Sequence, residues 1–395
     1  MNPWRGLQGL PREVWLLCTA TLVNRAGTMA LPFLVLYLTR SLHLSAGNAG
    51  LVLTLYGVGA LATAPLAGRL SDRVGPPRVL EGSLLVSGAI VLFYPAARGF
   101  AAILALTLLW AMTSEAFRPA SMAILTDLVA PERRKSAFAL NRLAVNLGMS
   151  VGPAAGGFLA AVSFRSLFFV DGATSILAGL VLAASTWRAN QIEGAGNPAV
   201  RERRPAKRTV DRRLLLFLAA LVPVLLVFFQ TQAAMALFLV RDLHILESQY
   251  GLLFTINTVL ILLVEVPLNG ATARWPHGRA LALGALLTGA GFGALSLATS
   301  YWSVAATVVV WTFGEMILLP GSAACAADMA PAARRGAYMG LYTMSFSAAF
   351  AVGPWLGTQV FERLGGAMLW GGTFLCGCLS AAMMGRIRSQ VREVR

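Results

Sequence analysis

Charged residues are scarce in this chain of 395 residues, of which they make up 12%. A soluble domain usually carries about 25% charged residues, so the shortage excludes a water-exposed surface over most of the chain. Apolar stretches long enough to span a bilayer, roughly 20 residues each, recur almost from end to end. Because lipid cannot satisfy free backbone groups, each stretch is predicted to be a helix.

Cysteines are few as well, and the four of them, Cys18, Cys325, Cys376 and Cys378, all lie within apolar segments. We interpret them as small packing residues, and the C-G-C pair lacks the further ligands that a zinc site needs. A nucleotide-binding loop, a metal-ligand cluster and a hydrolase nucleophile elbow are also missing from the sequence. The sequence therefore predicts no disulfide, no cofactor, no enzyme activity and no ATP-driven transport.

Acidic residues are outnumbered by basic ones, 17 to 32, which gives a net charge of +15. Such an excess can indicate nucleic-acid binding, but these bases lie in short loops between apolar segments. We therefore expect a lipid bilayer, and no nucleic acid, as partner. If the N-terminus is cytoplasmic, 24 of the 32 basic residues fall on the cytoplasmic side, five on the other side and three within spans. The positive-inside rule thus predicts a multi-pass plasma membrane protein (inner membrane in a bacterium) with both termini in the cytoplasm.

The chain contains twelve such apolar segments, in two sets of six. The predicted spans are residues 13–39, 48–71, 77–97, 101–129, 134–160, 166–187, 213–240, 249–270, 278–298, 303–328, 334–361 and 367–388. The one long polar stretch, a basic linker over 189–212, separates a first half, 1–188, from a second half, 213–395. We expect this linker to lie on the cytoplasmic side.

The two halves repeat each other at an offset of 201 residues. The stretch Arg118–Arg134 aligns with Leu319–Arg335, and V-G-P-A-A-G from Val151 aligns with V-G-P-W-L-G from Val352. The identical pairs include Pro119 and Pro320, Asp127 and Asp328, Arg133 and Arg334, and Arg134 and Arg335. Parallel repeats of this kind relate two halves by an axis along the membrane normal. The predicted fold is an all-α membrane protein with two six-helix pseudo-symmetric halves.

A charged loop, G-R-L-S-D-R-V-G-P-P-R from Gly68 to Arg78, joins the second and third spans. It resembles the loop signature G-x-x-x-D-R/K-x-G-x-R/K-R/K of the major facilitator superfamily, with Pro77 where a base is usual. The resemblance implies a conformational latch, in which Gly68 lets two helices approach and Arg78 pairs with a carboxylate such as Asp127. The latch residues are Gly68, Asp72, Arg73, Gly75, Arg78 and Asp127. A plain positive-inside loop is the alternative, and Ala273 at the position matching Asp72 places the latch mainly in the first half.

The fifth span carries N-L-G-M-S-V-G-P-A-A-G-G, from Asn146 to Gly157. It resembles the antiporter motif of twelve-span drug:proton antiporters, whose core is G-P-x-x-G-G. The predicted packing motif comprises Gly148, Gly152, Pro153, Gly156 and Gly157. These small residues are expected to pack tightly against a helix of the other half, with generic small-residue packing as the alternative. The fourth span departs from proton-coupled members, because Thr107 stands where a base is frequent and Trp110-Ala111 replaces Gln-Gly.

Seven ionisable residues fall within the predicted spans, where such residues are costly and usually functional. They are Arg25, Glu115, Arg118, Arg142, Asp171, Glu265 and Glu315. Glu115 and Arg118 share a helix face and can neutralise each other. Arg142 either joins that network or snorkels to the cytoplasm. Asp171 and Glu265 stand near span ends, which favours a solvated or interfacial role.

Glu315 lies near mid-span and has no basic neighbour within a turn, and at the repeat offset it matches Ser114, next to Glu115. Burial away from water favours the protonated carboxyl group, so a carboxylate at this depth can carry a proton. We expect Glu315 to be the leading proton-coupling residue and Glu115 the second. A carboxyl group that is simply hydrogen-bonded between helices is the alternative.

Polar and aromatic residues near mid-span, together with three arginines, form a candidate substrate cavity. They are Asn24, Arg25, Tyr56, Arg118, Arg142, Asn146, Gln230, Gln232, Asn257, Trp311, Tyr342 and Phe346. An aromatic wall with few polar anchors suits an amphipathic small molecule. The sequence favours a secondary transporter, monomeric as the resemblance implies, that exports hydrophobic or amphipathic compounds (multidrug efflux) in exchange for protons by alternating access. The arginines keep open an exporter of an anionic, sugar-like or lipid-like substrate without proton coupling.

Overall fold

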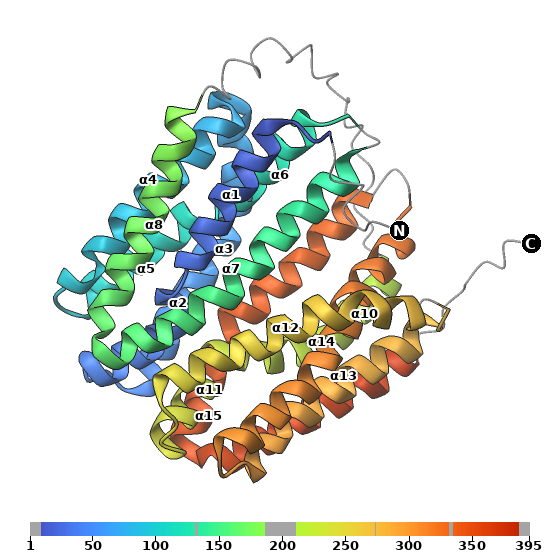
Figure 1. The fold of residues 1–395 in the computed structure, drawn as a ribbon. Helices are drawn as coiled ribbons and strands as arrows, with labels where there is room; N and C mark the ends of the chain where they lie inside the picture. Colours follow the sequence, from blue (N-terminus) through green and yellow to red (C-terminus); the bar gives the residue numbers. More distant parts are fainter. Residues whose placement is uncertain (1–8, 131–132, 186–210, 273, 332–334, 387–395) are drawn as a thin grey trace, which may run out of the picture. The chain divides into compact units, whose positions relative to one another are not determined.

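The computed structural model describes residues 9–130, 133–185, 211–272, 274–331 and 335–386. These residues form helices joined by short turns, and no strand occurs among them (Figure 1). Eleven helices within these ranges are long and apolar enough to span a bilayer. The last one contains two spans, because Gly365 interrupts it with a φ of 83°. Twelve spans result, which confirms the predicted all-α membrane architecture.

Helix bounds follow the predicted spans closely. The helices of the first half are α1 (Arg12–Gly27), α2 (Ala30–Leu36), α3 (Ala46–Val74), α4 (Pro76–Phe93), α5 (Phe100–Ser114), α6 (Phe117–Leu128), α7 (Arg134–Val162) and α8 (Phe164–Ala184). Those of the second half are α10 (Arg212–Phe228), α11 (Ala234–Leu237), α12 (Glu247–Thr272), α13 (His277–Gly293), α14 (Tyr301–Met329) and α15 (Arg335–Gly385). The first, fourth and seventh spans are each built from two helices, so three spans are interrupted.

Contacts divide the described chain into two compact units. The first comprises Met1–Phe33 with Leu55–Glu202, and the second comprises Leu34–Thr54 with Arg203–Arg395, as far as the structure describes them. Residues 34–54 therefore pack with the second unit. Gly47 at the start of α3, for example, donates its N–H to the Glu362 carboxylate at 2.8 Å. The division at the linker 189–212 stays a prediction, because almost all of that segment lies outside the described residues.

The backbone reproduces the 201-residue repeat in detail. A π-helical turn at Tyr37–Ser41 ends the first span, and another at Phe238–Asp242 ends the seventh. Each turn is followed by a histidine in the left-handed region, His43 with φ 54° and His244 with φ 53°. Non-glycine residues rarely adopt this conformation. Its recurrence at one offset confirms that the repeat is structural as well as sequential.

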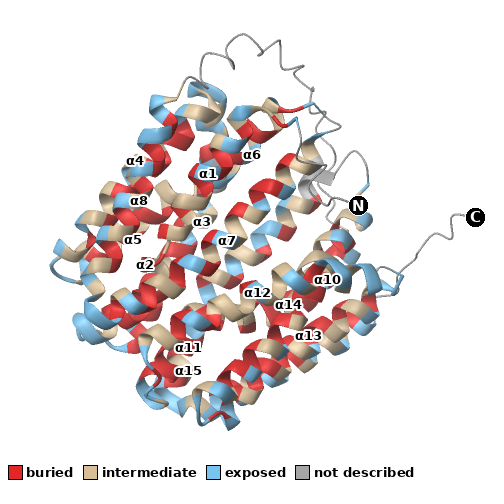
Figure 2. Cartoon of the chain, viewed as in Figure 1, coloured by how far each residue is buried: buried red, intermediate tan, exposed pale blue. Residues whose placement is uncertain are grey.

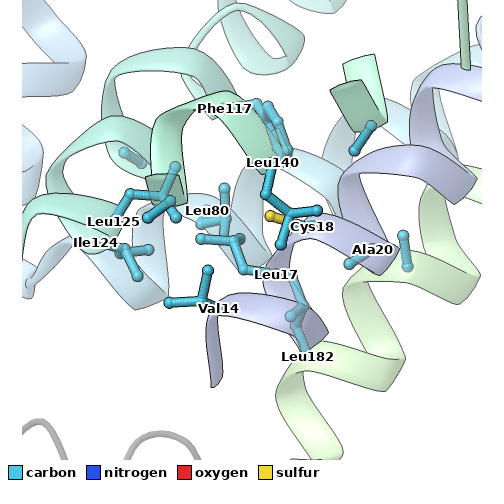
Figure 3. Packing of buried hydrophobic residues seen from close by; sticks show 14 of the residues in the cluster. Val14, Leu17, Cys18, Ala20, Leu80, Phe117, Ile124, Leu125, Leu140 and Leu182 are labelled. Carbon is cyan, nitrogen blue, oxygen red and sulfur yellow. The ribbon is translucent and has the colours of Figure 1, made fainter. Parts of the chain in front are cut away.

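Close packing of apolar side chains holds the first unit together. Helix α1 packs against α7 and α8, and its Val14 and Leu17 lie in one buried cluster with Leu80, Leu125 and Leu182 (Figure 3). Lipid tails are as apolar as these side chains, so the cluster is stabilised by van der Waals contact rather than by transfer from water.

Large apolar side chains also remain exposed along the helices. Phe158 on α7 and Leu263 and Val266 on α12 are 57%, 70% and 79% exposed, and exposed residues recur over the outer helix faces in Figure 2. A soluble protein rarely leaves such surfaces uncovered. Contact with lipid tails accounts for them.

Candidate functional site

A polar cluster in the first unit joins the second span to the fourth. The hydroxyl of Tyr56 in α3 lies 3.0 Å from the Ser114 hydroxyl and donates to Oε1 of Glu115 at 3.3 Å. Trp110, one turn before Ser114, packs edge-on against the Tyr56 ring with centroids 5.3 Å apart. Helix α5 ends at Ser114 and α6 begins at Phe117, so Glu115 lies in the interruption of the fourth span.

A corresponding cluster in the second unit joins the eighth span to the tenth. Nδ2 of Asn257 in α12 donates to Oε2 of Glu315 at 2.8 Å and to Oγ1 of Thr312 at 3.0 Å. Trp311 packs against Phe292 with ring centroids 5.4 Å apart. Helix α14 runs without interruption through Glu315.

The two clusters are related by the repeat. The matched pairs at an offset of 201 are Tyr56 and Asn257, Trp110 and Trp311, and Ser114 and Glu315. In each cluster a neutral donor on one span binds a carboxylate two spans further along the chain. The sequence analysis matched Glu315 with Ser114 but missed the pairing of their donors, although subtracting the offset from Asn257 would have given Tyr56.

The expected neutralisation of Glu115 by Arg118 does not occur in this structure. No ion pair joins the two among the described residues, and the Arg118 side chain is exposed. The backbone at Glu115 and Ala116 stays in the right-handed helical region, so the spacing of three residues allows a pair without requiring one. Arg142 on α7 is likewise exposed.

The first span supplies two of the predicted cavity residues. Nδ2 of Asn24 donates to Oγ of Ser175 in α8 at 3.0 Å. The guanidinium of Arg25 lies over the Phe117 ring, 5.6 Å from its centroid. Nε of Arg25 is buried without a hydrogen-bond partner in the described part of the chain.

Asp171 and Glu265, expected in solvated or interfacial positions, are instead buried, with 4% and 8% exposure. Oδ2 of Asp171 accepts the backbone N–H groups of Met29 and Ala30 at 3.2 and 3.0 Å. The sequence does not indicate the break in the first span that leaves these N–H groups without a helical acceptor. Position along the span was therefore a poor guide to the burial of Asp171. Glu81 in α4, at 4% exposure, is a further buried carboxyl group that the sequence analysis missed.

Three further cavity candidates make contacts within their own unit: Gln230, Tyr342 and Phe346. Nε2 of Gln230 donates to carbonyl oxygens of α10 and α15 at 2.8 and 2.9 Å. The Tyr342 hydroxyl lies 2.9 Å from that of Ser322, and its ring packs against Phe346 with centroids 5.1 Å apart. The two half-buried amides in this group are Asn146 and Gln232. Their roles stay predictions.

The predicted latch is only partly formed. Gly75 caps the start of α4 with a φ of 89°, a conformation that favours glycine. A Cβ at Gly68 would meet nothing within 4 Å, so the close approach expected there is not present among the described residues. Arg78 donates to a carbonyl oxygen of α3 at 3.4 Å, and no described ion pair joins it to Asp127. The exposed latch side chains are Asp72, Arg73, Arg78 and Asp127.

In the second half, Nε2 of His277 lies 3.0 Å from Oδ2 of Asp328, the residue that matches Asp127. The second half therefore also has a polar contact at the corresponding place, and the expectation that the latch lies mainly in the first half stays a prediction. The sequence comparison looked for arginine and overlooked a histidine at the start of the ninth span.

The packing motif in α7 contacts the first span of its own unit, and the expected contact with a helix of the other half stays a prediction. A Cβ at Gly152 would lie 2.9–3.1 Å from three carbonyl oxygens where the first span breaks. One at Gly156 would lie 2.8 Å from the Met29 Cβ, and one at Gly148 would overlap Arg25. The remaining motif residues, Pro153 and Gly157, are buried. Small residues predict a close approach, but their size does not identify the helix that approaches.

Twelve spans in two repeated sets, each with a carboxylate-bearing polar cluster at the same place, define a membrane transporter. A family model, the Major Facilitator Superfamily, matches residues 17–239 and 217–387, and the chain belongs to this family of secondary transporters.

Relatives in sequence agree with this assignment. An uncharacterized MFS-type transporter, YqjV, of Bacillus subtilis is 24% identical over 374 residues, 92% of this chain and 89% of the relative. A Na(+), Li(+), K(+)/H(+) antiporter of Planococcus maritimus is 22% identical and covers 84% of this chain and 85% of its own length. The quinolone resistance protein NorA of Staphylococcus aureus is 24% identical over 150 residues, 38% of each chain.

Solved structures share the fold. A POT family transporter in complex with 5-aminolevulinic acid superposes with a TM-score of 0.79 at 16% identity, over 97% of this chain and 96% of that one. A D-xylose-proton symporter superposes with a TM-score of 0.72 at 15% identity, over 95% and 97%. At this identity the likeness establishes the fold alone.

Proposed function

We propose that this transporter exports hydrophobic or amphipathic small molecules in exchange for protons, by alternating access of its two halves. The observation that carries the proposal is the pair of repeat-related clusters, in which Glu115 and Glu315 are each bound by a neutral donor. Relatives named for cation/proton antiport and quinolone resistance support it.

Glu315 is the leading proton-coupling residue and Glu115 the second. An ionised carboxylate only accepts hydrogen bonds, whereas the protonated form also donates one. The Asn257 amide offers both an N–H donor and a carbonyl acceptor, so it can stay bonded to Glu315 in either state. A carboxyl group away from bulk water that keeps its partner in both states is suited to taking up a proton on one side of the membrane and releasing it on the other.

The aromatic surroundings of the second cluster suit an apolar or amphipathic substrate. Trp311 packs with both Phe292 and Phe228, at centroid distances of 5.4 and 6.4 Å. Flat apolar walls with a few fixed polar groups bind drug-sized molecules without demanding one chemical structure.

We place the chain as a monomer in the plasma membrane, the inner membrane in a bacterium, with both termini in the cytoplasm. The distribution of its basic residues supports this orientation. The halves 1–188 and 213–395, joined by the basic linker, are the two bodies whose rocking would alternate access.

A drug-susceptibility panel in an efflux-deficient host tests the proposal. We expect cells producing the wild type, and not cells producing Glu315→Gln at equal levels, to survive higher concentrations of lipophilic cations and quinolones. Protection by neither protein against any compound would refute multidrug export.

An exporter of an anionic, sugar-like or lipid-like substrate that works without proton coupling is the second candidate. Arg25 favours it, because this partly buried cation has an Nε with no hydrogen-bond partner in the described chain. A guanidinium binds carboxylate or phosphate groups readily. Accumulation of such an anion in cells that lack the transporter, reversed by the wild type and not by Arg25→Gln, would decide for this candidate.

Tyr56→Phe tests the first cluster with a single-atom change. We expect export to slow about fivefold, because the hydrogen bonds to Ser114 and Glu115 are lost while the ring packing on Trp110 remains. Initial efflux rates of a fluorescent substrate at matched protein levels measure this. Tyr338→Phe is the control, since its hydroxyl donates to Asp211 at the start of α10. Equal slowing of both variants would contradict a role for the Tyr56–Glu115 contact.

A further inference from the structure

The first span is broken within the membrane, and a single buried carboxylate satisfies the backbone at the break. Helix α1 ends at Gly27 and α2 begins at Ala30. The N–H groups of Met29 and Ala30 therefore stand at the start of a new helix, where the helix itself provides no carbonyl acceptor. Lipid offers no acceptor for them. Oδ2 of Asp171, from α8, accepts both, at 3.2 and 3.0 Å.

The seventh span breaks at the equivalent place but is satisfied in another way. Helix α10 ends at Phe228, 201 residues after Gly27, and a 3₁₀ turn at Phe229–Gln232 continues the chain towards α11. The position that matches Asp171 is Gly372, where a Cβ would meet nothing within 4 Å. A broken span of this fold therefore does not require a carboxylate, and the one in the first half needs a separate explanation.

Asp171 belongs to a row of polar side chains that α8 directs at the break. Thr174 and Ser175, three and four residues further on, lie on the same helix face. Ser175 accepts a hydrogen bond from Asn24 at 3.0 Å, and Thr174 fills the space beside Gly27. The glycines of α7 contact the same segment from another helix, so both neighbours fix its position.

The break also positions a charge. The guanidinium of Arg25 lies over the ring of Phe117, 5.6 Å from its centroid, which places it beside the start of α6, two residues after Glu115. Because its Nε has no hydrogen-bond partner among the described residues, the place of Arg25 depends on the backbone that carries it.

We propose that Asp171 is a positioning residue for transport: its carboxylate oxygen holds the break of the first span and so keeps Arg25 over Phe117, next to the Tyr56–Glu115 contact. The role requires an acceptor oxygen at this place rather than a negative charge. Asparagine can fulfil it, because an amide oxygen accepts two hydrogen bonds, whereas alanine cannot. The role of Asp171 in transport rests on the proposed function, whereas its role in holding the break does not.

Hydrogen exchange in detergent-solubilised protein tests the contact without any substrate. We expect peptides covering residues 25–34 to exchange about tenfold faster in Asp171→Ala than in the wild type, since two buried N–H groups lose their acceptor. Asp171→Asn should exchange like the wild type, and so should Ser87→Ala, whose hydroxyl bonds only within α4. Fast exchange in Asp171→Asn, or unchanged exchange in Asp171→Ala, would overturn the proposal.

Ethidium efflux from cells, with the folded fraction measured by size-exclusion chromatography, tests the consequence for transport. We expect Asp171→Asn to keep the wild-type rate and half-saturating concentration within about threefold, and Asp171→Ala to raise the half-saturating concentration about tenfold. An Asp171→Asn protein that folds but does not transport would overturn the proposal even if the alanine variant fails to fold. If the wild type exports no ethidium, the proposed function fails, and the exchange result alone decides on Asp171.

Discussion

Glu315→Gln is expected to reduce proton-driven export to the leak rate of empty liposomes. Glutamine keeps the size of the side chain and can still accept the 2.8 Å hydrogen bond from Asn257, but it cannot bind and release a proton. The loss should therefore appear in coupling and not in folding. Reconstituted protein with an imposed pH gradient and ethidium as substrate gives the measurement.

Two further variants make this result specific. Asp242→Asn removes a carboxylate that pairs with Arg241 at the end of the seventh span and should leave gradient-driven export unchanged. Glu115→Gln should reduce export without abolishing it, if Glu115 is the second site. Undiminished gradient-driven transport by Glu315→Gln would show that its carboxyl group merely bridges α12 and α14.

The features that recur in the chain were the ones that the sequence predicted well. Apolar length defines a span because lipid enforces helices, and the last two spans were divided correctly, near the kink at Gly365. The 201-residue offset reappears in the π-helical turns and in the left-handed His43 and His244. Apolar length and the repeat offset can both be read from the sequence without knowing which helices pack together.

What escaped prediction depends on tertiary neighbours. Asp171 looked like a residue near a span end, yet it satisfies the backbone of another helix 141 and 142 residues away. Glu115 and Arg118 had the right spacing for a pair, but Arg118 is exposed and no ion pair joins the two among the described residues. Side-chain depth and spacing along one helix could not reveal either fact, because the neighbouring helices decide which side chains are buried and which partners they meet.

Gly152→Ala is expected to lower the free energy of unfolding by roughly 1–3 kcal/mol, the usual cost of overpacking, and to reduce transport strongly. A Cβ there would lie 2.9 Å from the Arg25 carbonyl oxygen and 3.0 Å from that of Thr28. These are backbone atoms at the break of the first span, so relief requires moving the segment that carries Arg25. Thermal midpoints in detergent and initial efflux rates give the two measurements.

The repeat supplies a matched control at Gly353, which stands 201 residues after Gly152 in the same G-P motif. The nearest atoms to a Cβ at Gly353 are 3.4 Å away, an ordinary contact distance. Gly353→Ala should therefore keep a near-wild-type midpoint and efflux rate, although motif and mutation are the same. If the two alanine variants behave alike, the motif acts through generic helix propensity, since alanine for glycine favours any helix by about 1 kcal/mol. A selective loss at Gly152 would instead show that the α7 glycines serve the broken first span, and that this motif, present in both halves, has a different structural task in each.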